Sequence, residues 1–238
     1  MIKITKKSCD FCEHHSHSMW DELLCHIPYT IFSLAFAFAF LGILNFITLT
    51  SPLHATESVY HGYHILFHTF HYLHIIVAVT GAMITFFRFS NNIVMGFLVA
   101  VIVPTSFCIV SDIMLPAIAG SLLGVDMHMH ICFFDLVDAF NLVAFMAAGV
   151  ICGSALLRHE ESLKLFALRS HFLHIFVSCL AALFYTVAHG FDAWYDAMGI
   201  LFVFLFIAVI IPCTLSDVVV PMYCARGSSK QRAGSNCA

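Results

Sequence analysis

Charged residues are scarce in this chain. Asp, Glu, Lys and Arg make up 10% of the 238 residues, hydrophobic residues make up 61%, and the mean hydropathy is +0.94. Soluble domains are typically about 25% charged and about 45–50% apolar. The shortage of charge excludes a soluble enzyme, because one soluble core could not bury this much apolar surface. It also excludes a basic surface for nucleic acid. The composition fits a chain whose solvent is lipid.

The segments between the apolar stretches are short, so the sequence has no room for a soluble domain between them. Six apolar stretches are each long enough to cross roughly 30 Å of hydrocarbon. They cover residues 27–48, 60–87, 93–116, 132–156, 165–189 and 197–221. We therefore expect an all-α integral membrane protein with about six transmembrane helices, either a monomer or a homo-oligomer. The first 24 residues are polar, so we expect no cleavable signal peptide.

Positive charge is confined to alternate connections between these stretches. The ten basic residues are Lys3, Lys6, Lys7, Arg88, Arg158, Lys164, Arg169, Arg226, Lys230 and Arg232. If six helices cross the membrane in alternating directions, all ten basic residues fall on one side of it. Loops that are enriched in Lys and Arg in this way are cytoplasmic. The sequence thus predicts a multi-pass protein with both termini in the cytoplasm. The opposite side is acidic and rich in histidine, and it should attract cations.

Two short motifs recur in the same order in the two halves of the chain. The segment His-Tyr-Leu-His-Ile-Ile-Val at 71–77 matches His-Phe-Leu-His-Ile-Phe-Val at 171–177, and Ser-Asp-x-x-x-Pro occurs at 111–116 and 216–221. Three helices per half with both ends inside predict a 3+3 inverted-topology repeat. The predicted segments are a cytoplasmic Cys/His-containing segment (1–24), a first repeat (25–121), a second repeat (122–225) and a disordered cytoplasmic tail (226–238).

Histidine is abundant, with sixteen residues against ten Lys and Arg. Five of them step by three or four positions along one predicted helix, namely His61, His64, His68, His71 and His74. This spacing puts them on one broad helix face. Imidazoles should not face lipid, so we expect that face to meet a cavity, another helix or a bound ion. Hydrogen bonding between helices is the alternative explanation.

The repeated histidine pairs are the strongest candidate metal ligands. An i, i+3 pair offers two nitrogens to one ion, and an aspartate from a neighbouring helix completes a set that suits zinc, iron, manganese or nickel. The predicted ligands are His71, His74 and Asp112 in the first half and His171, His174 and Asp217 in the second. Counting about 1.5 Å per residue from the nearest turns places the first set toward the outside and the second toward the inside. Two separate sites are therefore expected.

Further polar residues are weaker candidates. An accessory metal site or outer vestibule is predicted at His61, His64, His68, Asp135, Asp138 and His189. The N-terminal Cys9, Cys12, His14, His15 and His17 form either a chelating tract or a polar tail. Cysteines in or beside apolar runs, including Cys108, Cys132, Cys152, Cys179 and Cys213, are interpreted as small hydrophobic residues without a disulfide framework.

Three functions fit these patterns. The first is a transporter or channel for a divalent transition-metal cation. The second is an electron-transfer protein with bis-histidine haem between the helices at 60–87 and 165–189, although the poorly matched depths of His74 and His174 argue against it. The third is a metal-dependent membrane enzyme, which we consider less favoured because the chain has no long histidine box and no nucleophile motif.

Overall fold

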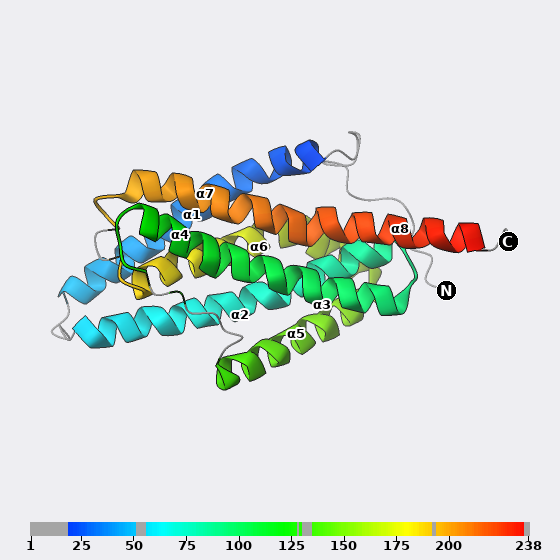
Figure 1. Cartoon of the computed structure of the whole chain (residues 1–238), viewed down its shortest axis with the longest axis horizontal. Helices are drawn as coiled ribbons and strands as arrows, with labels where there is room; N and C mark the ends of the chain where they lie inside the picture. The colour runs from blue at the N-terminus through cyan, green and yellow to red at the C-terminus, as the bar shows by residue number, and fades with distance from the viewer. Residues whose placement is uncertain (1–18, 51–55, 128, 130–134, 192–193, 236–238) are drawn as a thin grey trace.

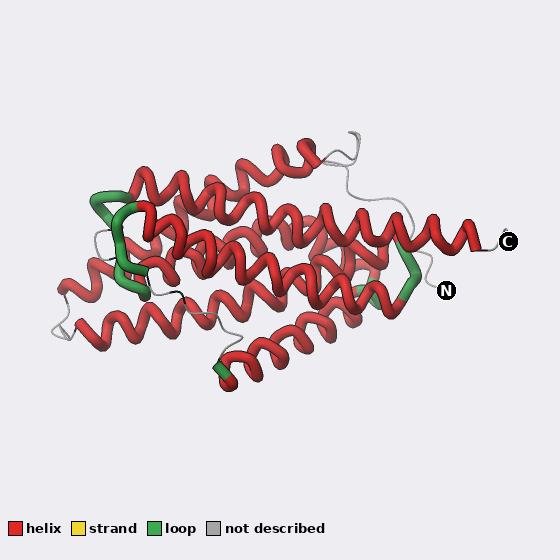
Figure 2. Tube along the Cα trace, in the orientation of Figure 1, coloured by secondary structure: helices red, strands yellow, loops and turns green. Residues whose placement is uncertain are grey.

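The structure is a computed structural model that describes residues 19–50, 56–127, 129, 135–191 and 194–235. Within these ranges the chain is helical, with short loops and no strand (Figure 2). The helices are α1 (Met19–Thr50), α2 (Thr56–Phe89), α3 (Ile93–Ile109), α4 (Leu115–Leu122), α5 (Leu136–Leu156), α6 (Glu160–Ala188), α7 (Met198–Thr214) and α8 (Val220–Ser235). The expected all-α class is confirmed.

Two of the long helical rods each contain a short π-helical turn. The turn η1 (Val110–Met114) joins α3 to α4, and η2 (Leu215–Val219) joins α7 to α8. In Figure 1, α2, α5 and the α7–α8 rod run from left to right, while α1, the α3–α4 rod and α6 run back. The start of α1 and the end of α8 therefore lie toward the same end of the bundle.

Several rods are long and apolar enough to cross a membrane. Among the described residues, five spans meet this description, at His26–Thr50, Val59–Phe89, Ile93–Leu122, Leu136–Leu156 and Met198–Gly227. The helix α6 contributes the shorter apolar segment Phe172–Ala188. These helices are compatible with a multi-pass membrane protein, as the hydropathy predicts. The cytoplasmic position of the termini stays a prediction.

Exposed polar residues occur at both ends of the bundle. Arg88 lies in the last turn of α2 and Arg158 follows α5, and these two helices finish toward the right in Figure 1. His61 lies near the start of α2 and Asp126 follows α4, and these segments lie toward the opposite end. The basic face and the acidic, imidazole-rich face stay predictions.

The C-terminal tail differs from the prediction. Residues 226–238 were expected to be disordered, but α8 continues to Ser235. After Pro221 the segment has no further proline, and its Ala, Arg, Lys and Gln residues favour helix. The Arg226 guanidinium also lies 5.4 Å from the centre of the Phe89 ring, which is a cation–π contact between α8 and the end of α2.

The middle of the bundle is formed by α2 and α6. The helix α2 packs against α6, α5 and α3, and α6 also packs against α1 and α7. Both helices bury small residues, with Ala78 and Ala82 of α2 and Ala181 and Ala182 of α6 fully buried. Small side chains allow membrane helices to approach closely, where dispersion forces and interhelical hydrogen bonds can act. The polar residues of both helices are consequently brought into one interior.

The helix α5 packs on the outside of α2 through two glycines four residues apart. A Cβ atom at Gly149 would lie 2.8 Å from Val79 Cβ and 3.0 Å from the Ile76 carbonyl oxygen, and one at Gly153 would meet Met83. The Thr80 hydroxyl donates a hydrogen bond of 3.1 Å to the Gly149 carbonyl. This is the small-xxx-small contact that is common between membrane helices.

We expect Gly149→Ala to lower the free energy of unfolding by about 1–3 kcal/mol, because the added methyl overlaps α2. Unfolding in mixed detergent micelles, followed by circular dichroism, measures the change. Gly42→Ala is the matched control, since nothing lies within 4 Å of a Cβ at that position of α1. Equal stability of the two variants would contradict the proposed close packing.

Candidate metal centre

Asp112 and Asp217 each occupy the middle position of a π turn. In both turns the residue that follows donates its N–H to the carbonyl five residues back, rather than four. A proline stands four residues after each aspartate, at Pro116 and Pro221. A proline ring collides with the carbonyl four residues before it, so Asp-x-x-x-Pro favours a widened turn. Such turns inside α-helices are frequently found at functional sites.

The Asp112 carboxylate is fully buried and accepts four hydrogen bonds. The Nδ1 atoms of His71 and His74 both lie 2.8 Å from Oδ2. The hydroxyls of Ser111 and Ser178 donate to Oδ1 over 2.7 and 2.9 Å. Because a carboxylate only accepts, the two imidazoles donate from Nδ1, and a neutral ring then keeps a lone pair on Nε2. Asp112 thus orients both histidines of α2.

The two halves of the chain meet at a pair of imidazoles. Nε2 of His74 lies 3.1 Å from Nε2 of His174, and the two rings are almost perpendicular at 88°. Behind the second ring, His174 Nδ1 lies 3.8 Å from Asp217 Oδ2. Asp217 fits against α2 because Gly81 has no side chain, and a Cβ there would overlap the carboxylate. Each central imidazole therefore has a carboxylate on its far side and the other imidazole in front.

Two cysteines complete the environment of this pair. The Sγ atoms of Cys213 and Cys108 lie 3.8 and 3.7 Å from His74 Nε2. His74 Nε2, His174 Nε2 and Cys213 Sγ all lie within 4.8 Å of one another. We call these three residues the central cluster. All three are buried, with exposed fractions of 1%, 1% and 3%.

The central cluster fits a tetrahedral metal ion in both donor type and spacing. Metal–ligand bonds of about 2.0–2.3 Å hold the ligand atoms of such an ion roughly 3.3–3.8 Å apart. The observed separations of 3.1 and 3.8 Å from His74 Nε2 lie close to this range. A carboxylate that accepts from the opposite ring nitrogen is the usual support for a metal-binding histidine. The group could therefore hold a metal ion.

The predicted role of Asp112 as a direct ligand is not what the structure shows. Its Oδ2 atom contacts the Nδ1 side of the His71 and His74 rings, whereas the ligand group faces Nε2. Asp112 is placed to orient a ligand rather than to be one. The Nε2 atom of His71 has no hydrogen-bond partner within the part of the chain that the structure describes. This histidine lies beside the cluster and is not a member of it.

The prediction of two separate sites, one near each membrane face, is wrong. His74 and His174 are in contact, and their aspartates lie behind them. The reason is helix length. With 34 residues, α2 is about 51 Å long, so a residue roughly 24 Å from its inner end lies near its middle. The helix α6 has 29 residues, and His174 lies at its midpoint.

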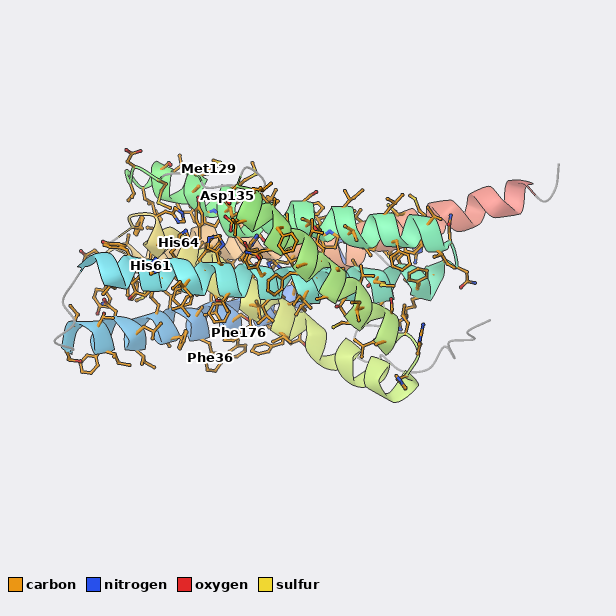
Figure 3. The ribbon with its side chains drawn as sticks, turned by 90° about the horizontal axis from the view of Figure 1, so that it is seen from below. Phe36, His61, His64, Met129, Asp135 and Phe176 are labelled. Atoms are coloured by element: carbon orange, nitrogen blue, oxygen red, sulfur yellow. The ribbon has the colours of Figure 1, made fainter. Side chains whose placement is uncertain are left out.

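The remaining predicted site residues lie in several different places. The structure places His171 in α6, but its side chain lies outside the described part, as do Cys9, Cys12, His14, His15 and His17. Asp135 caps α5, since its Oδ1 accepts from the backbone of Val137 (2.8 Å). The vestibule role of Asp135 stays a prediction. His61 is exposed at the outer end of α2, and Figure 3 shows it and His64 toward the same end of the bundle as Asp135.

Cys108 and Cys213 are the site residues that the sequence interpretation missed. They were assigned as small hydrophobic residues because they lie in apolar runs. The available signal was a longer form of the repeated motif, Cys-x-x-Ser-Asp-x-x-x-Pro, which occurs at 108–116 and 213–221. In both copies the serine Oγ lies close to the cysteine carbonyl oxygen, at 3.2 and 3.1 Å. The recurrence of both geometry and sequence marks these cysteines as part of the site.

No protein-family model, curated protein sequence or solved structure matches this chain. The geometry of the site corrects one earlier argument about haem, because the depths of His74 and His174 agree. Two axial haem ligands need nitrogens about 4 Å apart, and these lie 3.1 Å apart. The haem alternative stays a prediction.

Proposed function

We propose that the chain is a membrane transporter for a divalent transition-metal cation, which it binds at the central cluster. The observation that carries the proposal is the convergence of His74 Nε2, His174 Nε2 and Cys213 Sγ within 4.8 Å. The three ligands come from α2, α6 and α7, so both halves of the chain contribute. Ionisable groups within membrane helices are expensive to bury and mark ion pathways in many proteins.

The position of the cluster supports transport over a purely structural role. Asp112 lies 19 residues after the start of α3, and Asp217 lies 19 residues after the start of α7. The two rods run in opposite directions (Figure 1), and each is interrupted by a π turn at its aspartate. Transporters commonly bind their ions near the bilayer midplane, between inverted repeats with interrupted helices. The predicted inverted repeat is part of this proposal.

Among the ions that the sequence favours, zinc is the first candidate. The predicted set was zinc, iron, manganese or nickel, and it assumed a carboxylate ligand. Replacing that carboxylate by a cysteine sulfur favours zinc, whereas manganese prefers oxygen ligands. A mixed imidazole and thiolate environment with tetrahedral spacing is typical of zinc. The acidic, imidazole-rich end of the bundle offers the cation a favourable approach.

Zinc flux into proteoliposomes tests the proposal. We expect vesicles with the purified protein to accumulate Zn²⁺ faster than protein-free vesicles, as reported by an enclosed zinc-sensitive dye. Cys213→Ser should lower the rate about 10-fold or more, because it removes one ligand. Cys152→Ser is the matched control, since that cysteine is exposed on α5. A protein that binds Zn²⁺ tightly but gives no flux above empty vesicles would contradict transport.

A metal-dependent membrane enzyme is the second candidate. One observation favours it, because three mutually close protein ligands leave a fourth position for water or substrate, as in catalytic zinc sites. The flux measurement separates the two functions. Stoichiometric zinc without transport would favour the enzyme, while zinc flux that depends on Cys213 would favour the transporter.

A further inference from the structure

A second group of histidines lies on α2 nearer the outer end of the bundle. His64 and His68 are separated by one helical turn, and their Nε2 atoms are 3.3 Å apart. We call them the outer histidine pair. They line a surface hollow of about 390 Å³ between α2 and α5, together with Ile65, Thr69, Tyr72, Leu73 and Phe145. The hollow is open on one side and lies within the apolar spans Val59–Phe89 and Leu136–Leu156.

The spacing of the outer histidine pair suits chelation of one ion. Histidines at i and i+4 on a helix form the familiar two-imidazole half of many zinc sites. Bonds of about 2.0–2.1 Å at cis or tetrahedral angles place two ligand nitrogens roughly 3.0–3.4 Å apart. The observed 3.3 Å lies within that range. The two side chains already have the geometry that an ion would require.

Neighbouring helices bring a third imidazole and a carboxylate near the outer histidine pair. His189, at the end of α6, donates from Nδ1 to the Tyr185 carbonyl over 2.9 Å, which leaves Nε2 of a neutral ring as an acceptor. Its ring centre lies 5.9 Å from that of His64. Asp138 Oδ1 lies 4.0 Å from His68 Nδ1 and accepts a 3.0 Å hydrogen bond from Tyr72. The carboxylate is fixed behind His68 and supplies negative charge for a cation.

Phe67 separates the outer pair from the central cluster. Its side chain is fully buried, and its ring centre lies 4.8 Å from that of His68 and 5.5 Å from that of His71. His64 and His74 are ten residues apart on α2, which is about 15 Å along the helix. The two groups of ligands are therefore distinct, with an aromatic ring between them.

We propose that His64 and His68 form a second binding site for a divalent transition-metal ion, with the His189 imidazole and the Asp138 carboxylate beside the pair. Its use as a loading site before the ion reaches the central cluster rests on the proposed transport function. The binding of an ion by these residues does not. A site rich in imidazole and without sulfur also differs chemically from the central cluster, which contains Cys213.

A cobalt titration distinguishes the two sites. The full-length protein is used with any affinity tag removed and with Cys9, Cys12, His14, His15 and His17 replaced by Ser or Gln, so that the N-terminal tract binds no ion. We expect two equivalents of Co²⁺, one with a sulfur-to-cobalt charge-transfer band and one with ligand-field bands only. H64Q/H68Q should lose one equivalent and retain the charge-transfer band, which also shows that the variant is folded. H74Q/C213S should lose that band and retain the other equivalent.

His61→Gln is the matched control, because His61 is exposed on the same helix and lies outside the hollow. It should leave two equivalents. An unchanged stoichiometry in H64Q/H68Q would overturn the outer site. If the parent protein binds one equivalent that is lost in H64Q/H68Q, and shows no sulfur-to-cobalt band, the outer site stands and the central metal site fails.

Discussion

We expect His74→Ala to weaken Zn²⁺ binding at the central cluster at least about 100-fold and to abolish zinc flux. Loss of a supporting residue at a metal site typically lowers affinity 10–100-fold, so loss of a ligand should exceed that range. His74 also lies between four groups of the site. Its Nε2 faces His174, Cys108 and Cys213, while its Nδ1 faces Asp112. Isothermal titration with Zn²⁺ and the vesicle assay measure both effects.

A buried histidine elsewhere provides the control for this substitution. His26 of α1 is 4% exposed and does not belong to the central cluster. His26→Ala removes the same buried imidazole and leaves the proposed ligands intact, so zinc affinity at the cluster should be unchanged. Equal losses of affinity in the two variants would show that the effect comes from packing and would count against a metal site at His74.

Asp112→Asn should destabilise the protein by roughly 2–4 kcal/mol and lower zinc affinity about 10–100-fold. Four donors converge on the two carboxylate oxygens. An amide replaces one of those oxygens by an NH₂ group. This group is a donor, and it would face N–H or O–H groups that are also donors, in a fully buried position. The ring of His74 then loses the acceptor that orients it. Thermal unfolding in detergent and zinc titration report the two losses separately.

The exposed Asp126 offers the matched comparison for this change. Asp126→Asn removes the same charge in a loop at the outer end, where water can satisfy the amide. Its stability and zinc affinity should equal those of the parent protein within error. If Asp112→Asn were as stable as Asp126→Asn, the four-donor arrangement around Asp112 would not hold in the protein.

The positions of the helices could be predicted from the sequence because lipid imposes a simple rule. Backbone groups in hydrocarbon must be satisfied within the segment, so a long apolar run becomes a helix. The run at 60–87, for example, lies within α2, and the run at 93–116 lies within the α3–α4 rod. Helix ends were less predictable. The structure extends α8 to Ser235, because residues outside the membrane follow ordinary helix propensity rather than hydropathy.

The members of the site were partly predictable, but their arrangement was not. His74, His174, Asp112 and Asp217 stand out because they recur at matching places in both halves. Their depth was misjudged because residues were counted from the turns. Such counting assumes helices that begin at the membrane surface, whereas α2 extends well beyond a 20-residue span. The same error led to the prediction that His74 and His174 lie at different depths.

The cysteines illustrate a second limit of interpreting composition. A thiol in an apolar run behaves as a small hydrophobe in most proteins, and nothing in hydropathy distinguishes Cys213 from Cys152. The structure distinguishes them, because Cys213 is buried beside two imidazoles and Cys152 is exposed on α5. Only the recurrence of Cys-x-x-Ser-Asp before a proline carries that information in the sequence.

The two π turns have a consequence for motion. A π turn holds one residue more than an α turn, and this surplus can migrate along a helix as a travelling defect. When it moves past a residue, that residue swings by about 100° around the helix axis while both helix ends keep their places. Migration past the aspartates would swing Asp112 away from His74 and Asp217 away from His174. Such a movement would withdraw the carboxylates that stand behind the two imidazoles.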